Sequence, residues 1–198
     1  NIDRICALFR ACLICGKTLV LDPYTANVLA AVAGLNPKIP TITTAEQMKA
    51  YFPPRLTTRL TERNKDQYIY SLNPKQNKVS YDDFARSPEK YVMLVRPTVL
   101  TYLQRIKAAR IRLIKSIWGG YWDEPNTERF RSWVEEHCEQ VKDIHSSGHA
   151  DTQSLQRIVE HIRPQTIIPI HTDSPSSFGD LFSESHILYL SDNRSIEL

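Results

Sequence analysis

Two histidines that follow apolar runs are the residues of this 198-residue chain best suited to chemistry. His149 lies in the segment His145-Ser-Ser-Gly-His-Ala-Asp151, and His171 directly follows Ile-Ile-Pro-Ile. An imidazole can transfer a proton, stabilise charge on a phosphoryl group or bind zinc. If each apolar run is a strand of one parallel sheet, both imidazoles reach the same edge of that sheet. The pattern therefore predicts phosphate or metal chemistry.

The turn before His149 has the composition of an anion site. It is expected between a strand and a helix, where Gly148 lets the backbone turn tightly and approach a ligand closely. The first turn of the following helix presents free N–H groups that suit a phosphate. An ordinary strand-to-helix turn with an exposed histidine is the more frequent explanation of such a segment. The spacing between His145 and His149 does not by itself assign a role to His145, since this residue can reach a phosphate or simply end the strand.

His171 is well placed to bind a metal but cannot form a site alone. A zinc ion needs three or four ligands, and Asp173 offers at most one more oxygen or a group that orients the ring. A structural histidine would give the same local pattern. The chain therefore looks like one half of an active site.

Composition is ordinary for a soluble globular protein, with 41% hydrophobic and 24% charged residues and a net charge of +3. Four cysteines and the lack of a secretory leader predict reduced thiols and a cytoplasmic location. Cys12 and Cys15 have C-x-x-C spacing, but they are predicted to be buried small hydrophobic residues in an apolar helix. The apolar runs are too short to cross a bilayer.

Three features allow a nucleic-acid partner without requiring one. Two basic runs lie at residues 55–65 and 105–115, and such runs can follow a phosphate backbone or form solvated helix faces. The aromatic residues of Trp118-Gly-Gly-Tyr-Trp122 can stack on nucleobases or pack against a neighbouring domain.

The pattern of apolar runs and turn residues predicts alternating strands and helices, and hence βαβ units with a largely parallel sheet. Strands are expected at residues 18–22, 39–42, 68–70, 91–96, 111–118, 141–145, 166–170, 187–190 and 195–198. Helices are expected at residues 5–15, 25–32, 44–52, 99–109, 126–140, 151–162 and 176–182, with residues 55–66 helical or a surface connection and residues 72–90 a loop. Asp22 is expected to cap the helix at 25–32, or to line a cleft at the sheet edge with Thr25.

The segments at 141–151 and 164–171 together resemble the C-terminal part of β-CASP nucleases of the metallo-β-lactamase fold, which include ribonuclease J. The histidine after a strand, the helix and the second histidine of Pro-Gln-Thr-Ile-Ile-Pro-Ile-His171 match that family in order and spacing. Residues 16–26 and 116–121 resemble the β-CASP insert. The resemblance implies an α/β fold in two parts: a β-CASP cap domain over residues 1–140, with a mainly parallel sheet flanked by helices, and a C-terminal segment of the αββα metallo-β-lactamase fold over residues 141–198.

The resemblance also implies roles for individual residues. His149 matches a histidine at the cleavage centre that contacts the scissile phosphate, and His171 matches a zinc ligand that accompanies RNA substrates. His145, Ser147 and Gly148 match a turn that holds the substrate phosphate. The chain departs from the family at Thr172-Asp173, where Gly-Glu is usual.

The family's H-x-H-x-D-H zinc cluster belongs to an N-terminal metallo-β-lactamase part that this sequence does not contain. We therefore expect the chain to be the C-terminal portion of a longer zinc-dependent ribonuclease that acts in RNA processing. An Asn at position 1 and an immediate helix agree with this expectation. Its expected partners are RNA and the missing part of the same protein, and an oligomer is compatible with the sequence. The two zinc ions of the parent site are not expected to bind this chain alone, which should be inactive.

Two other classes of function fit the same residues. The chain can be a non-catalytic module that binds RNA or a protein through its basic runs. It can also belong to a lactamase-fold hydrolase of a small phosphoester or ester.

Overall fold

The computed structural model of the chain describes residues 2–65, 67–72, 74–106, 110–145 and 148–191. The chain forms two compact units, Asn1–Ile144 and His145–Leu198. The predicted boundary near residue 140 falls inside a strand, β5 (Cys138–Asp143), which belongs to the first unit.

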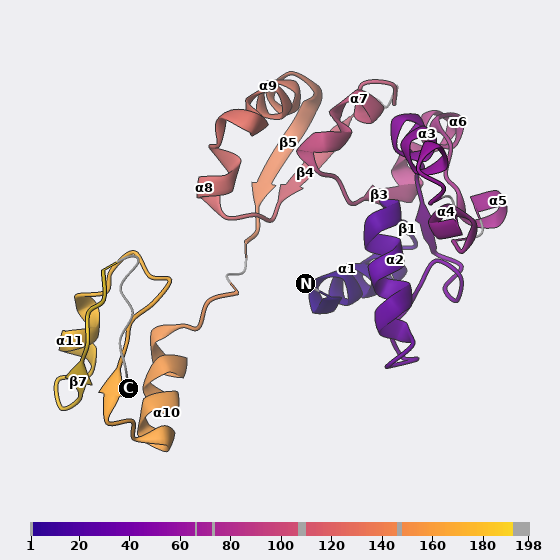
Figure 1. Ribbon diagram of the computed structural model, residues 1–198. Helices are drawn as coiled ribbons and strands as arrows, with labels where there is room; N and C mark the ends of the chain where they lie inside the picture. The colour runs from indigo at the N-terminus through magenta and orange to yellow at the C-terminus, as the bar shows by residue number, and fades with distance from the viewer. Residues whose placement is uncertain (1, 66, 73, 107–109, 146–147, 192–198) are drawn as a thin grey trace. The chain divides into compact units, whose positions relative to one another are not determined.

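A three-stranded parallel sheet organises the first unit (Figure 1). Its order is β2 (Met48–Ala50), β1 (Thr18–Leu21), β3 (Tyr91–Met93). Leu19 pairs with Met48 on one side and with Val92 on the other. Short parallel strands joined through helices confirm the predicted α/β class.

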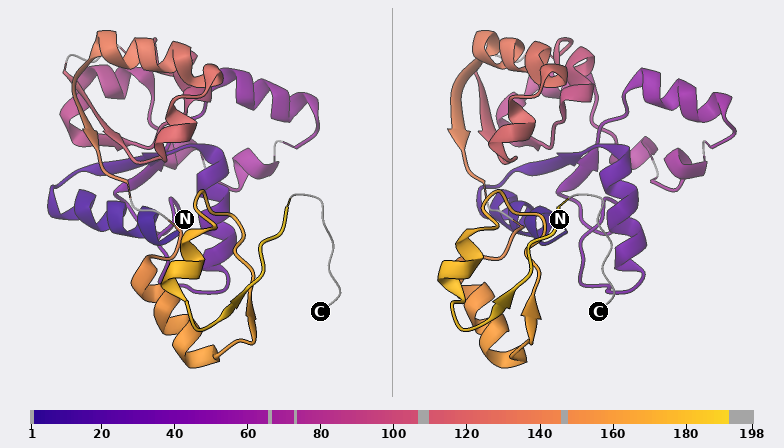
Figure 2. Two further views of the ribbon diagram at one scale, coloured as in Figure 1. Left: turned by 90° about the vertical axis from the view of Figure 1, so that its left-hand side faces the viewer. Right: turned by 60° about the vertical axis from the view of Figure 1, so that its left-hand side comes forward.

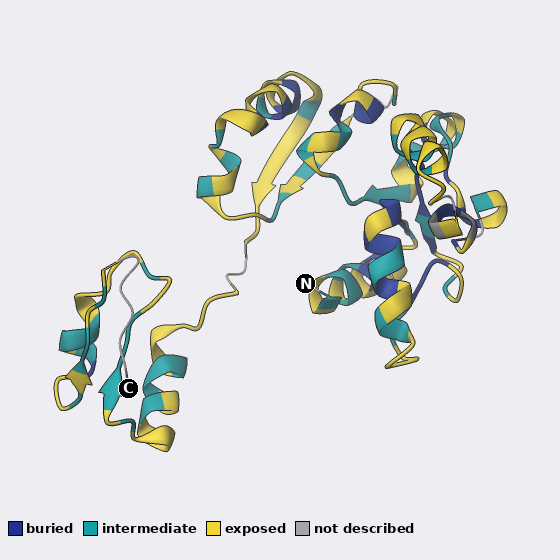
Figure 3. Ribbon diagram, in the orientation of Figure 1, coloured by how far each residue is buried: buried dark blue, intermediate teal, exposed yellow. Residues whose placement is uncertain are grey.

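The central strand β1 is buried on both faces, as parallel strands commonly are. Leu19 and Leu21 pack into one apolar cluster with Leu29, and Val20 packs into a second cluster with Tyr51. All five side chains are fully buried. Figure 3 shows this burial as dark blue on β1 and on the neighbouring helix α2. The core of the first unit therefore lies on both sides of this one strand.

Two helices flank β1 in the sequence, and each has a recognisable end. Helix α1 (Ile2–Ile14) ends at Gly16, whose φ of 63° is left-handed; Gly16 and Lys17 donate their backbone N–H groups to the carbonyls of Leu13 and Cys12. This is a Schellman motif, which satisfies the last carbonyls of a helix. Helix α2 (Pro23–Ala33) begins at Asp22, whose side chain accepts a hydrogen bond from the backbone N–H of Thr25. The start of α2 at Asp22 was predicted from the sequence.

A second parallel pair, β4 (Ile111–Lys115) and β5, also belongs to the first unit. Helix α9 (Glu128–His137) lies beside this pair of strands (Figure 2). Its side chains Trp133 and Val134 pack with Leu113 of β4 on the inner side of the pair. The outer side carries Ile114, which is 56% exposed. This small sheet therefore has a core on one face only.

The other described helices of the first unit are α3 (Pro54–Glu62), α4 (Gln67–Tyr70), α5 (Pro74–Asn77), α6 (Tyr81–Arg86), α7 (Leu100–Leu103) and α8 (Gly119–Trp122), with 3-10 turns η1 (Pro88–Lys90), η2 (Pro97–Val99) and η3 (Pro125–Thr127).

Several predicted elements of the first unit are wrong, because tertiary pairing overrides local preference. The expected helix at 44–52 contains strand β2, because these residues pair with β1. The expected helix at 126–140 stops at His137, since β5 pairs with β4. Residues 39–42 form turns rather than a strand, with the Thr41 hydroxyl bonded to those of Thr43 and Thr44.

Other errors concern short helices. Residues 67–70 form α4 rather than a strand, and residues 72–90 contain α5 and α6 rather than a loop. Helix α6 begins with a capping box in which Ser80 and Asp83 bond each other's backbone N–H groups. The expected helix at 99–109 is reduced to α7, and residues 107–109 lie outside the described part of the chain.

The second unit contains helix α10 (Thr152–Ile162), helix α11 (Ser177–Leu181) and a parallel pair of two-residue strands, β6 (Thr166–Ile167) and β7 (His186–Ile187). Both helices were predicted within two residues, but β6 and β7 are shorter than expected. The expected strand at 195–198 lies outside the described residues. Phe182 is the one buried hydrophobic residue described in this unit, and Ile162 and Ile170 are largely exposed.

No helix in the part of the chain that the structure describes has the length and the apolar character that a bilayer crossing requires.

Replacing Leu29 by Ala should destabilise the first unit by about 2–5 kcal/mol, because it leaves a cavity beside β1. Leu35→Ala is the matched control: Leu35 is 89% exposed, and its loss should cost less than about 0.5 kcal/mol. Urea unfolding followed by tryptophan fluorescence measures both, since all three tryptophans lie in the first unit. Equal effects of the two substitutions would contradict the placement of the core.

Candidate functional site

The two predicted site histidines lie against each other in the second unit. His149 is in the segment between β5 and α10, and His171 is in the segment between β6 and α11. Their ring centroids are 4.9 Å apart, with an angle of 52° between the ring planes. Residues that are far apart in the sequence thus place two imidazoles where one group can contact both.

The position of His149 depends on how helix α10 begins. The carboxylate of Asp151 accepts a hydrogen bond of 2.7 Å from the backbone N–H of Ser154, which fixes the first turn. That hydrogen bond, with a further contribution from the Ser154 side chain, holds the pKa of Asp151 below its ordinary value. One of the free N–H groups that suited a phosphate is therefore already occupied by Asp151.

His171 lies at a sharp turn of the backbone. Its φ is 54°, in the left-handed region that residues other than glycine seldom adopt. The backbone N–H of Ser174 then bonds to the Thr172 hydroxyl and closes the turn. Uncommon backbone conformations of this kind gather at functional sites. Asp173 is exposed.

The three residues predicted to hold a substrate phosphate have different outcomes. His145 and Gly148 are exposed beside His149 in the sequence. Gly148 is not in the left-handed region, and a Cβ added to it would meet nothing within 4 Å. The turn itself therefore does not require glycine. A ligand that approaches the backbone closely would require it, because a Cβ would then have no room. Ser147 lies outside the described residues.

The two imidazoles suit zinc by their donor chemistry but do not complete a site. Zinc takes nitrogen donors from histidine and needs three or four protein ligands. Within the described residues, no group of three or more histidine, cysteine or acidic side chains could hold a metal ion. Ligands beyond this pair would have to come from elsewhere.

A comparison with known families decides what this region is related to. Residues 133–187 match the family model of a Zn-dependent metallo-hydrolase RNA specificity domain. The matched region contains His145, Gly148, His149 and His171, and supports a relationship to nucleases of the metallo-β-lactamase family. No curated protein and no solved structure gives a significant match. The matched region does not reach residues 1–132, so the β-CASP cap stays a prediction.

Most of the other motifs from the sequence have structural explanations. Cys12 is buried, which raises the pKa of its thiol, whereas Cys15 is exposed. This difference supports packing rather than a redox pair. The rings of Trp118 and Tyr121 meet edge to face at 5.5 Å and are both more than half exposed.

Two features were not anticipated. A cavity of about 580 Å³ lies between α7, β4 and α9, with Leu100, Trp133 and His137 among its lining residues, and contains none of the predicted site residues. Arg96 pairs with Asp22, with 3.5 Å between Nε and Oδ2. An arginine directly after an apolar strand was the only sign of this pair in the sequence.

The cap of α10 should respond to acid. Because the pKa of Asp151 is depressed in the folded chain, its contribution to stability is complete above the ordinary value near 3.8 and is lost as the pH falls through the lower folded value. The amide NMR signal of Ser154 should titrate with a midpoint below 3.8. In Asp151→Asn, which keeps a good cap without a titrating group, this shift should vanish. A wild-type midpoint above 4 would contradict the hydrogen bond.

Proposed function

We propose that the chain supplies the second part of a zinc-dependent phosphodiesterase that cleaves RNA. Two observations support this: the contact between His149 and His171, and the match of the surrounding residues to an RNA specificity domain. The contact carries the proposal, because it unites the residues on which the family resemblance depends.

Each histidine has its own role in this proposal. His171 is a metal ligand, and His149 contacts the scissile phosphate and donates a proton to the leaving oxygen. Because their rings are 4.9 Å apart, a phosphate held near the metal lies within reach of His149. His145, Ser147 and Gly148 hold the same phosphate, and the open space beside Gly148 leaves room for it.

Zinc, once bound, would supply a polarising charge and an activated water. His171 cannot hold it alone, so the remaining ligands belong to a metallo-β-lactamase part outside this sequence. The chain alone is therefore inactive, and residues 1–140 act as the substrate-binding cap.

The test is RNA cleavage by the longest form of the protein that contains residues 1–198. His149→Ala and His171→Ala should each lower the cleavage rate of single-stranded RNA at least about 100-fold. His161→Ala is the matched control, since His161 is an exposed histidine of the same unit that bonds only its own helix; this variant should keep its activity.

The outcome separates the competing classes of function. RNA binding without cleavage would replace the proposal with a non-catalytic binding module. Cleavage of a dinucleotide or another small phosphoester in preference to a polymer would replace it with a small-substrate hydrolase.

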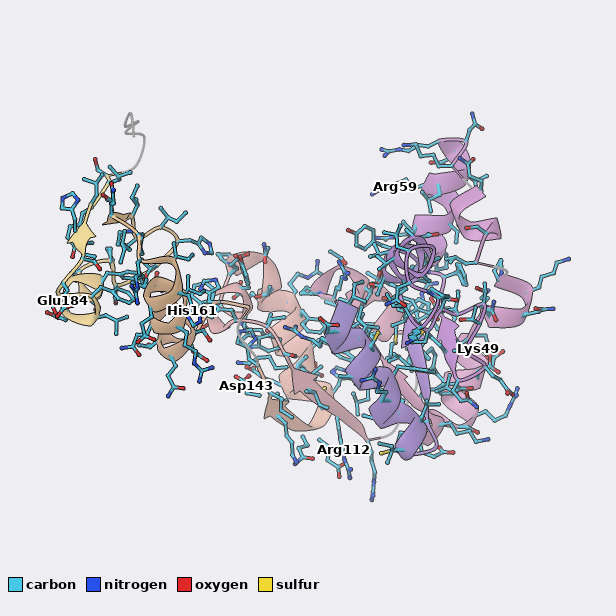
Figure 4. All side chains as sticks on the ribbon, turned by 90° about the horizontal axis from the view of Figure 1, so that it is seen from below. Lys49, Arg59, Arg112, Asp143, His161 and Glu184 are labelled. Carbon is cyan, nitrogen blue, oxygen red and sulfur yellow. The ribbon has the colours of Figure 1, made fainter. Side chains whose placement is uncertain are left out.

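Helix α3 offers a surface that fits the RNA part of the proposal. Arg55 and Arg59 are exposed and lie one turn apart on the same side, and exposed Arg63 follows at the end of the helix. Figure 4 labels Arg59 among the side chains that extend outward from α3. None of the three arginines pairs with an acidic side chain of the described residues. Their spacing allows successive phosphates of one strand to be neutralised.

Replacing Arg55, Arg59 and Arg63 together by Gln should weaken RNA binding and flatten its dependence on salt. Each lost phosphate contact lowers the slope of log K against log salt by about 0.7 for single strands, so three contacts lower it by roughly 2. Fluorescence anisotropy at several NaCl concentrations measures this slope.

The control variant loses three positive charges as well, but at other positions of the first unit. Arg10, Lys38 and Lys90 are exposed cations without an acidic partner in the described part of the chain. Replacing these three by Gln should leave the slope within about 0.7 of the wild-type value. A similar drop in both triple variants would mean that α3 has no special role.

A further inference from the structure

A group of polar side chains outside the histidine pair lies at the carboxyl ends of the parallel strands β1, β2 and β3. Asp22 directly follows β1, Tyr51 directly follows β2, and Arg96 follows β3 by three residues. From β1 the chain moves to β2 on one side of the sheet, and then crosses to β3 on the other side. The strand order therefore reverses at β1, and open α/β sheets bind their ligands at the carboxyl ends of the strands beside such a reversal.

The guanidinium of Arg96 is held in place from one side. Its Nε lies 3.5 Å from Asp22 Oδ2, and its Nη2 donates to the Thr25 hydroxyl at 3.2 Å. The Thr25 hydroxyl in turn donates to Asp22 Oδ2 at 2.7 Å. Asp22 and Thr25 are both more than nine-tenths buried, whereas the side chain of Arg96 is 49% exposed. Buried partners thus fix an arginine whose outer side faces solvent.

The outer side of Arg96 retains hydrogen-bonding capacity. A guanidinium has five N–H donors, and Nη1 has no partner among the described residues. A fixed planar fork with free donors is the group that proteins use to bind phosphate. The ion pair with Asp22 explains why Arg96 is ordered, but it leaves these donors unused.

An exposed aromatic ring lies beside this arginine. Tyr24 is 65% exposed, and Cζ of Arg96 is 5.3 Å from the centre of its ring. Tyr24 belongs to the first turn of α2, which Asp22 fixes through its bond to the Thr25 backbone. The ring is thus held by an ordered helix turn and still presents area to solvent.

Tyr51 adds a polar group that the fold does not use. It is fully buried, and its hydroxyl has no hydrogen-bond partner in the described part of the chain. Burial, followed by the charge of Asp22, raises the pKa of this phenol, so it stays a neutral donor. An unpaired buried donor costs free energy, and a functional role is one of the explanations for such a group in a folded protein.

We propose that Tyr24 and Arg96 bind one nucleotide unit of a single-stranded RNA. The base stacks on the Tyr24 ring, and a phosphate oxygen accepts hydrogen bonds from the Arg96 guanidinium. Asp22 and Thr25 position the arginine and do not touch the ligand. This inference rests on RNA as the substrate of the proposed function, and it assigns a subsite for that RNA on the first unit.

The test uses the full chain, a fluorescently labelled single-stranded RNA of twelve nucleotides, and a buffer with EDTA, so that binding is measured without cleavage. Base stacking on an aromatic ring contributes to the affinity for single strands, so Tyr24→Ala should weaken binding roughly tenfold. Tyr24→Phe, which keeps the ring, should bind within about twofold of the wild type. Arg96→Lys keeps the charge opposite Asp22 but loses the fork, and should weaken binding several-fold.

Leu35→Ala is the control, since Leu35 is an exposed apolar residue of the same unit with 89% exposure. It should leave binding unchanged. Unfolding curves of Tyr24→Ala and the wild type should coincide, because Tyr24 is mostly exposed. A wild-type affinity in Tyr24→Ala, or an equal loss in Leu35→Ala, would overturn the proposed subsite.

Three further outcomes distinguish this proposal from its alternatives and from the proposed function. Tight binding of uridine or adenosine monophosphate that displaces the RNA would assign the site to a free nucleotide and overturn the RNA subsite. RNA binding that depends on Tyr24, in a protein that cleaves no RNA in any form, would support the subsite and reject the proposed function. Failure of the wild-type chain to bind RNA would overturn the subsite, whereas the proposed function is decided by the cleavage test on the longer protein.

Discussion

The first unit depends on a strand that is buried on both of its faces. Three residues of β1, Leu19 to Leu21, connect two apolar clusters, and the strand forms backbone hydrogen bonds with β2 and with β3. Because every side chain from Leu19 to Leu21 is fully buried, the strand cannot shift in register without exposing apolar groups. The carboxyl end of β1 is thereby fixed, and Asp22 with it. The cap of α2 and the position of Arg96 both follow from this anchoring.

The second unit has a different basis. With Phe182 as the buried hydrophobic residue described there, it has little apolar core of its own. The contact between His149 and His171 is instead set by local features: the cap at Asp151 and the left-handed turn at His171. An arrangement of this kind places functional groups accurately but contributes little stability. It fits a segment that completes a larger fold.

Local signals in the sequence predicted what depends on neighbouring residues. The cap at Asp22 and the helices α10 and α11 were predicted. The expectation that His149 and His171 follow strands of one parallel sheet was wrong, because β5 and β6 belong to different sheets. The contact between the two rings is made by the segments that follow these strands. The strand β2 could not be predicted, because Met48–Ala50 forms a strand only through its pairing with β1. The ion pair between Asp22 and Arg96 could not be predicted either, because 74 positions separate the two residues and no local pattern links them.

The pairing of β1 also has a consequence for the order in which the chain folds. Leu19 must find Met48 and then Val92, and each closure of a long loop costs conformational entropy before the contact repays it. A sheet made of such distant pairs forms slowly. During synthesis the apolar residues of β1 leave the ribosome well before β3 exists. Until Val92 has been synthesised, the strand can pair on one side only, so its second edge and its apolar side chains stay open to contact with other chains.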